Sequence, residues 1–157
     1  MEIVLSRIDD RLIHGQVATV WSKVTGCNRI IVCSDEVAAD ELRKTLLVQV
    51  APPGIKANVL AVDKAIEVYK NPKYASFKTL FLFTNPTDVL RMVEGGVDIK
   101  SVNIGGMAFK EGKRQITSAV SVDDKDVDSF KKLNEKGIEL EIRKVVTDTK
   151  VDLMSKL

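Results

Sequence analysis

The chain has 157 residues, of which 45% are hydrophobic and 29% charged, and its formal net charge is +2. This composition predicts one globular domain, residues 1–157, and the small net charge and 5% aromatic content argue against nucleic-acid binding. No apolar run approaches the about 18 residues that span a bilayer, and the chain opens on a strand rather than a signal sequence, so we expect a cytoplasmic protein.

The first elements are a strand, a charged loop and a helix. Residues 3–5 form an apolar run of strand character, and residues 7–13 (RIDDRLI) read as a loop. Gly26 ends the helix. The apolar face of this helix, with spacings of i, i+3, i+4 and i+7, consists of Val17, Val20, Trp21 and Val24.

Strand-length apolar runs then alternate with helical patterns. The expected strands are 29–33, 57–62, 79–83, 101–104, 119–122 and 138–142, and the last alternates like an edge strand with one wet face. Residues 105–117 form a Gly-rich, charged connection of hairpin character. The tail, with Val151 and Met154, predicts one loose helical turn.

Capping residues mark the helices between these strands. Ser34 opens a helical region whose apolar positions are Val37, Leu42, Leu46, Leu47 and Val50. Later helices are capped by Asp63, by Thr84 or Asn85, and by Asp123, and the last two end at Gly95–Gly96 and Gly137.

This alternation predicts an α/β fold: an open, mostly parallel, doubly wound sheet with helices on both faces and an antiparallel edge near the C-terminus. Ligands of such sheets gather outside the carboxyl ends of the strands. That edge would bring together four segments: His14, Ser34–Asp35, Thr84–Asn85 and Gly105–Gly106.

His14 is the only histidine, and it stands between a strand and a helix start. A helix N-terminus attracts anions, and Arg7 and Arg11 add forked donors that match phosphate geometry. These residues predict a nucleophilic imidazole that carries an anionic group. The alternative is a structural histidine beside an ordinary surface cluster of Arg7, Asp9, Asp10 and Arg11.

Other polar and sulfur-containing residues allow two interpretations each. Gly105–Gly106 predicts either a positive-φ turn or close backbone approach to a phosphoryl group or partner. Thr84–Asn85 predicts a helix cap whose N–H groups could also touch phosphate. Cys27 and Cys33 are expected to be buried small apolar residues, not a disulfide or a metal site. The sequence contains no P-loop, dinucleotide fingerprint, zincin motif or nucleophile elbow.

The string at residues 7–17 (RIDDRLIHGQV) resembles the phosphorylation-site loop of enzyme IIB of the sugar phosphotransferase system, mannose/fructose/sorbose family. A second stretch, residues 102–107 (VNIGGM) and 114–117 (RQIT), resembles the same family. The resemblance runs from the first strand to residue 142.

The resemblance implies a phosphocarrier, a protein-N(π)-phosphohistidine–sugar phosphotransferase. His14 would accept a phosphoryl group on Nδ1 from a phosphohistidine of enzyme IIA. It would then pass the group to a sugar held by membrane enzyme IIC/IID, beside which the protein would lie peripherally. The resemblance implies no metal or cofactor, and it places the histidine strand centrally, where the strand order reverses.

Within this mechanism, Arg11 is the first choice for contacting the phosphoryl oxygens and Arg7 the second, and Asp9 or Asp10 orients an arginine or a loop N–H group. Gly15 serves a sharp turn and leaves room for a partner, and Gln16 contributes backbone to the loop. Leu12 and Ile13 either contact partners or are buried under the loop, and Lys110–Arg114 help to steer an acidic partner.

Two other classes stay open from the residues alone: a non-enzymatic, flavodoxin-like regulatory or anion-binding module, and a phosphate-binding metabolic enzyme. The sequence does not identify the sugar or the oligomeric state, and a homodimer is one option.

Overall fold

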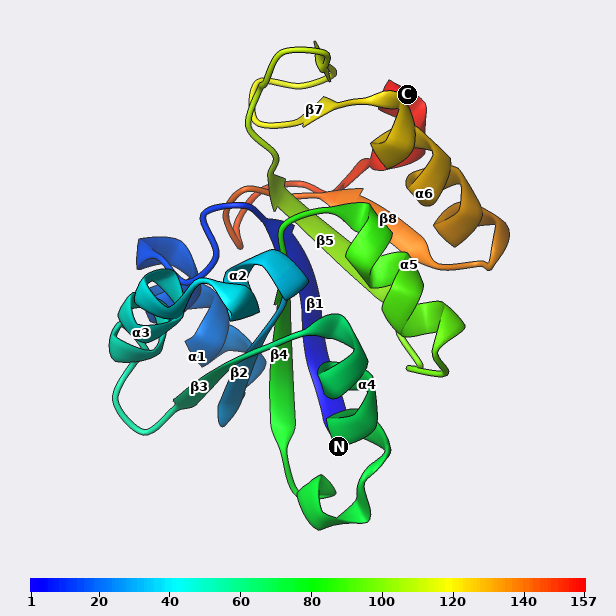
Figure 1. Cartoon of the computed structure of the whole chain (residues 1–157). Helices are drawn as coiled ribbons and strands as arrows, with labels where there is room; N and C mark the ends of the chain where they lie inside the picture. The colour runs from blue at the N-terminus through cyan, green and yellow to red at the C-terminus, as the bar shows by residue number, and fades with distance from the viewer.

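The computed structural model describes residues 1–157, except the side chain of Ala18. In this described chain, seven strands form one sheet in the order β3-β2-β4-β1-β5-β8-β9, parallel apart from the pair β8–β9, and a separate antiparallel ribbon joins β6 and β7 (Figure 1). The strands are β1 (Glu2–Asp9), β2 (Arg29–Cys33), β3 (Lys56–Leu60), β4 (Lys78–Phe83), β5 (Ser101–Gly106), β6 (Arg114–Gln115), β7 (Ser121–Val122), β8 (Glu139–Ile142) and β9 (Val151–Asp152).

Helices cover the sheet from both sides, which confirms the predicted doubly wound architecture. Three helices pack on one face: α4 (Val62–Lys70), α5 (Pro86–Glu94) and α6 (Asp124–Glu135). The opposite face carries η1 (Val17–Trp21), α1 (Ser22–Thr25), α2 (Asp35–Ala39) and α3 (Glu41–Gln49). Two short 3-10 turns complete the chain, η2 (Pro72–Tyr74) and η3 (Leu153–Lys156). Among the described residues, no helix is long and apolar enough to cross a membrane.

The core has two layers because successive side chains of a strand point to opposite faces of the sheet. In β4, Phe81 and Phe83 belong to the cluster under α4, α5 and α6, whereas Leu80 and Leu82 belong to the cluster under the other helices. Strands buried on both faces read as continuous apolar runs, which is why these strands were found from sequence.

Strand β1 is central and holds the catalytic-site candidate at its carboxyl end. It pairs with β4 on one side and with β5 on the other. The connection that follows β1 crosses the face covered by η1, whereas the connections that follow β4 and β5 cross the face covered by α5 and α6 (Figure 1). This reversal beside β1 is the crevice-forming arrangement expected of such sheets, as the resemblance implied.

Several element predictions are confirmed by their capping contacts. The hydroxyl of Ser34 accepts from the Val37 N–H, Asn85 caps α5, and Asp123 forms a capping box with Asp126. Helix α1 ends at Gly26, which has a φ of 67°.

Three element predictions are wrong in detail. The region after Ser34 forms two helices because Asp40 is extended and caps α3. Helix α4 begins at Val62 rather than after Asp63, and a carboxylate from α2, that of Asp35, accepts from the Val62 N–H at 2.9 Å. Strand β8 is not the edge, because β9 pairs with it antiparallel. The predicted helical turn of the tail is present as η3, which follows β9.

Some apolar side chains predicted to face inward are exposed. Val24 is 63% exposed. Leu42 and Leu46 of α3 and Val50 at its C-terminal end are also exposed, whereas Val37 and Leu47 are buried as predicted. These apolar positions do not belong to one continuous helix, because the region is interrupted at the extended residue Asp40.

Candidate phosphoryl-transfer site

The charged string before His14 is only partly a loop. Arg7 and Asp9 belong to β1, where Arg7 lies opposite Leu82 on β4 and Asn103 on β5. Both charged side chains are 0% exposed, which a central strand tolerates only when the charges are paired. The prediction of a loop over residues 7–13 is therefore wrong for its first three residues.

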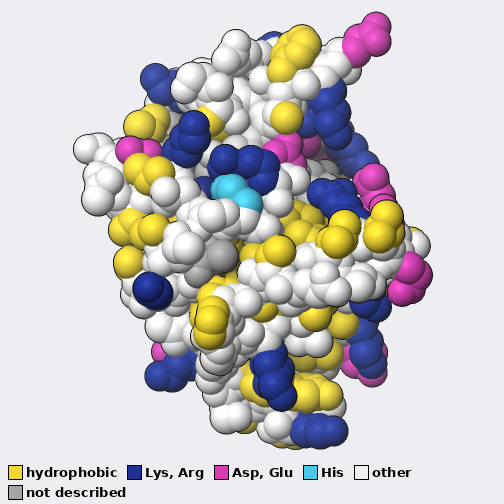
Figure 2. All heavy atoms as spheres, turned by 90° about the vertical axis from the view of Figure 1, so that its left-hand side faces the viewer, with side chains coloured by type: hydrophobic (Ala, Val, Ile, Leu, Met, Phe, Trp, Pro, Cys, Tyr) yellow, Lys and Arg dark blue, Asp and Glu magenta, His cyan; other side chains and the backbone are white. Residues whose placement is uncertain are grey.

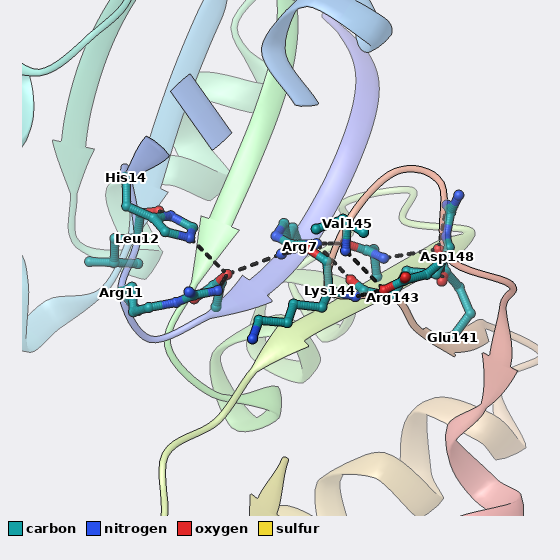
Figure 3. Close-up of polar contacts among 11 residues, drawn as sticks. Arg7, Arg11, Leu12, His14, Glu141, Arg143, Lys144, Val145 and Asp148 are labelled. Atoms are coloured by element: carbon teal, nitrogen blue, oxygen red, sulfur yellow. Dashed lines mark hydrogen bonds and ion pairs between the residues drawn. The ribbon is translucent and has the colours of Figure 1, made fainter. Parts of the chain in front are cut away.

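Asp9 is the centre of the site, since three cationic or ionisable groups surround its carboxylate (Figure 3). Arg11 meets it fork to fork, with Nε at 3.0 Å from Oδ1 and Nη2 at 2.9 Å from Oδ2. Arg7 Nη2 lies 3.1 Å and His14 Nε2 3.7 Å from the same Oδ2. Burial alone would raise the pKa of this carboxyl, but the hydrogen bonds from Arg11 and the charge of Arg7 hold its pKa below the usual range.

The two arginines have different roles. Arg11 keeps its side chain 45% exposed while it pairs with Asp9, and these hydrogen bonds raise its pKa. Arg7 is fully buried, and its terminal nitrogens donate to Asn103, to Asp9 and to the carbonyls of Arg143 and Lys144. Arg7 therefore cannot reach a phosphoryl group on the surface, and its prediction as a second phosphate ligand is wrong.

The turn after β1 presents the imidazole. The Leu12 N–H donates to the Asp9 carbonyl at 2.8 Å, and Leu12 has a φ of 60°, the only positive φ of a non-glycine residue in the described chain. The cost of such a conformation, about 1–3 kcal/mol, is offset by burying Leu12 completely. Leu12 and Ile13 are both buried, so the alternative that they contact partners is wrong.

His14 lies between two hydrogen-bond acceptors. Its Nδ1 is 3.0 Å from the Leu12 carbonyl, and its Nε2 faces Asp9. The ring is 21% exposed and visible on the surface directly beside a basic side chain (Figure 2). A neutral imidazole carries one N–H, so it donates to one of these acceptors and keeps a lone pair on the other nitrogen.

Asp10 secures the loop to the neighbouring strand. Its Oδ2 accepts from the Ala108 N–H at 2.6 Å, and its own N–H donates to the Gly106 carbonyl. Both carboxylates make contacts of the kind predicted for them: Asp9 accepts from the two arginines, and Asp10 accepts from a loop N–H.

Gly105 has a role that neither sequence interpretation included. It lies inside β5, and a Cβ there would be 1.9 Å from Nη2 and 2.1 Å from Cζ of Arg7. It is glycine because the buried guanidinium of Arg7 occupies the side-chain position. Gly106 is less restricted, since its Cβ would meet Asp9 at 3.4 Å.

Replacing Gly105 with alanine is therefore expected to destabilise the fold by about 3 kcal/mol, because the new methyl group displaces a buried, paired guanidinium. Gly106→Ala is the matched control, with ordinary contact distances. Urea unfolding of both variants measures the difference, and equal stabilities would show that Arg7 moves aside without cost.

The remaining predicted residues lie at the same sheet edge but not against His14. Thr84 and Asn85 line a groove of about 610 Å³ that also includes Asp10, and Asn85 acts as the helix cap. Gly15 and Gln16 follow the imidazole as the first residues of the helical stretch, and Gly15 has no positive φ. The sharp-turn role predicted for Gly15 is therefore wrong.

Sequence reasoning missed the residues beyond β8. Lys144 shares a hollow of about 220 Å³ with Arg11, and the carbonyls of Arg143 and Lys144 hold Arg7. No local pattern could have linked residues 143–144 to residue 7. Cys27 and Cys33 are buried free thiols, as predicted, and burial raises the pKa of both.

The class of this protein is therefore an α/β protein whose doubly wound sheet carries a basic, histidine-bearing loop at the carboxyl end of its central strand. The family model described as PTS system sorbose subfamily IIB component matches residues 3–157. The chain belongs to this family of IIB components.

Relatives and solved structures agree with this assignment. The chain is 66% identical over 160 residues to the PTS system mannose-specific EIIAB component of Escherichia coli (strain K12), covering 100% of this chain and 50% of the relative. It thus spans about half the length of that relative. The sorbose-specific EIIB component of Klebsiella pneumoniae is 54% identical over 157 residues, covering 100% and 96%. The crystal structure of the IIBSor domain of the Klebsiella pneumoniae sorbose permease superposes with a TM-score of 0.97 at 54% identity, covering 99% and 96% of the two chains.

Proposed function

We propose that this protein is a phosphocarrier that takes a phosphoryl group from a phosphohistidine of enzyme IIA onto His14 and passes it to a sugar held by membrane enzyme IIC/IID. The observation that carries the proposal is the only imidazole of the chain, partly exposed beside the Asp9–Arg11 pair. The relative whose name joins IIA and IIB supports enzyme IIA as the donor. Family membership supports a sugar of the mannose, fructose and sorbose class and a cytoplasmic position beside the permease.

The chemistry requires a lone pair on the attacked nitrogen. Attack through Nδ1 forms the new N–P bond while the N–P bond of the donor phosphohistidine breaks, and the ring proton then sits on Nε2. In that tautomer, Nε2–H points toward Asp9 Oδ2, at a present separation of 3.7 Å. The ring must therefore release the Leu12 carbonyl before it accepts the group.

Arg11 supplies the charge that phosphoryl transfer needs. It is exposed and already oriented by Asp9, whereas Arg7 stays with Asp9 beneath it. Because Asp9 retains Arg7, Arg11 can shift toward phosphoryl oxygens without leaving a buried carboxylate unpaired. We therefore assign phosphate contact to Arg11 and positioning to Arg7 and Asp9.

Incubation with radiolabelled phospho-IIA tests the proposal. A carrier takes up one phosphoryl group per chain, and mass spectrometry maps it to His14 as an acid-labile phosphoramidate. An anion-binding module or a phosphate-binding enzyme would retain no covalent label. Absence of label, or label on Cys33, would overturn the proposal.

Gly15→Ala is expected to slow transfer from phospho-IIA without weakening the fold. A Cβ at this exposed glycine meets no atom within 4 Å beyond its own helical turn and chain neighbours, so only an approaching partner would contact it. Alanine also favours the helical stretch by several tenths of a kcal/mol. Unchanged transfer rates, measured alongside thermal unfolding, would show that the partner does not approach Gly15.

Both partners are expected to dock on the face around His14, because one imidazole must meet two active sites in turn. The exposed cations available to steer them are Arg11, Lys110, Arg114 and Lys144, whereas Lys113 is paired with Asp126. Association should weaken as salt rises. Amide shifts in titrations with IIA and then with IIC/IID membranes measure this, and two separate perturbed surfaces would refute a shared face.

A further inference from the structure

A chain of buried polar contacts leads away from the site across strands β5 and β8. It begins at Asp9, continues through Arg7 to Asn103 on β5, and reaches Glu141 on β8. The exposed fractions of these side chains lie between 0% and 3%. Figure 3 shows His14 at one end of the network, Arg7 in its middle and Glu141 at the opposite end.

Glu141 determines which way the Asn103 amide faces. The Asn103 Nδ2 donates to Glu141 Oε1 at 3.1 Å, so its Oδ1 is turned toward Arg7 and accepts from Nη1. Because Glu141 accepts from the amide NH₂ group of Asn103, the amide oxygen is the atom that faces Arg7. If the amide turned over, an NH₂ group would face the guanidinium, and two donors would oppose each other.

A second route joins Glu141 to the same guanidinium. Both oxygens of Glu141 accept from Arg143, at 2.9 Å from Nε and 2.8 Å from Nη2. The carbonyl of Arg143 in turn accepts from Arg7 Nη1 at 3.0 Å. Trp21 stacks against both guanidinium groups, with its ring centroid 4.8 Å from Arg7 Cζ and 5.2 Å from Arg143 Cζ.

We propose that Glu141 is a positioning residue for phosphoryl transfer: through Asn103 and Arg143 it fixes Arg7, and through Arg7 it fixes the Asp9 carboxylate that orients Arg11 and His14. The inference rests on the proposed function of His14. It assigns a role in the reaction to a residue on β8 that touches neither the imidazole nor Arg11.

Glu141→Leu and Glu141→Gln separate positioning from packing. Leucine removes the acceptor, whereas glutamine keeps an acceptor oxygen for Asn103. We expect the leucine variant to accept phosphate from phospho-IIA on the order of 10-fold more slowly, because small misplacements of reacting groups are costly, and the glutamine variant to recover most of the rate. Glu139→Leu is the matched control on the same strand, since the Glu139 carboxylate accepts from Ser101 and Lys150 rather than from Asn103 or Arg143.

A readout besides activity comes from His14 itself. As the only histidine, it gives one unambiguous set of imidazole NMR signals. Glu141→Leu is expected to shift the His14 ring ¹⁵N signals, and Glu141→Gln and Glu139→Leu to leave them close to those of the parent protein. A slower variant with unshifted signals, or equal rates for Glu141→Leu and Glu139→Leu, would overturn the positioning role.

Coupling to Asn103 gives the second test. Since Glu141 acts largely through this amide, adding Glu141→Leu to Asn103→Ala should slow transfer much less than Glu141→Leu does alone. Fully additive effects would contradict the relay. Parent protein that takes up no label at His14 would instead refute the proposed function, so the two failures are distinguishable.

Discussion

Replacing His14 with alanine is expected to abolish phosphoryl uptake from phospho-IIA while leaving the fold intact. The ring makes one hydrogen bond, to the Leu12 carbonyl, and is partly exposed, so its removal should change the free energy of unfolding by less than about 1 kcal/mol. The measurement is label incorporation per chain, with unfolding midpoints of both proteins as the control for folding.

The other candidate nucleophile, the thiol of Cys33, is not expected to replace His14. Cys33 is 0% exposed, and burial raises the pKa of its thiol well above the usual value, so the reactive thiolate is disfavoured. Sustained labelling of His14→Ala would therefore contradict the histidine mechanism. A double variant with Cys33→Ala would then show whether the thiol carries the label.

Arg11→Ala is expected to slow transfer by about 10²–10³-fold, because preorganised charge beside the transferring group contributes on this scale. Arg11→Lys keeps the charge but loses the fork that meets Asp9 through two nitrogens, so its rate should fall between those of the parent and the alanine variant. Arg43→Ala is the control: Arg43 also donates to the loop, at the Asp10 carbonyl, but touches neither Asp9 nor His14. Equal rates for Arg11→Ala and the parent protein would refute the assignment.

Arg11→Ala should also be less stable than the parent protein at neutral pH, and this difference should narrow in acid. In the parent protein the lowered pKa of Asp9 contributes stability that is fully present above about pH 4, the ordinary value for Asp, and is lost as pH falls through the lower folded-state pKa. Without the hydrogen bonds from Arg11, the folded-state pKa rises and this contribution shrinks. Unfolding midpoints between pH 7 and pH 3 measure the effect.

The sequence by itself determined the order of elements and indicated the candidate residue for phosphoryl transfer. Strands β2 and β4 are apolar on both faces, and caps such as Ser34, Asn85 and Asp123 use local hydrogen bonds, so both could be read from neighbouring residues. The eleven-residue string around His14 indicated the family, and the family model confirms it.

Only the tertiary structure decided which arginine is exposed. Arg7 and Arg11 look equivalent in sequence, but Arg7 lies inside the central strand, where partners from β5 and the segment after β8 neutralise and bind it. Gly105 and Glu141 were misinterpreted for the same reason. Gly105 makes room for the Arg7 guanidinium. Glu141 was expected on the solvent-facing side of its strand, but it is buried. Contacts between residues about 100 positions apart depend on strand order, and strand order is set by the packing of the whole sheet rather than by any local pattern.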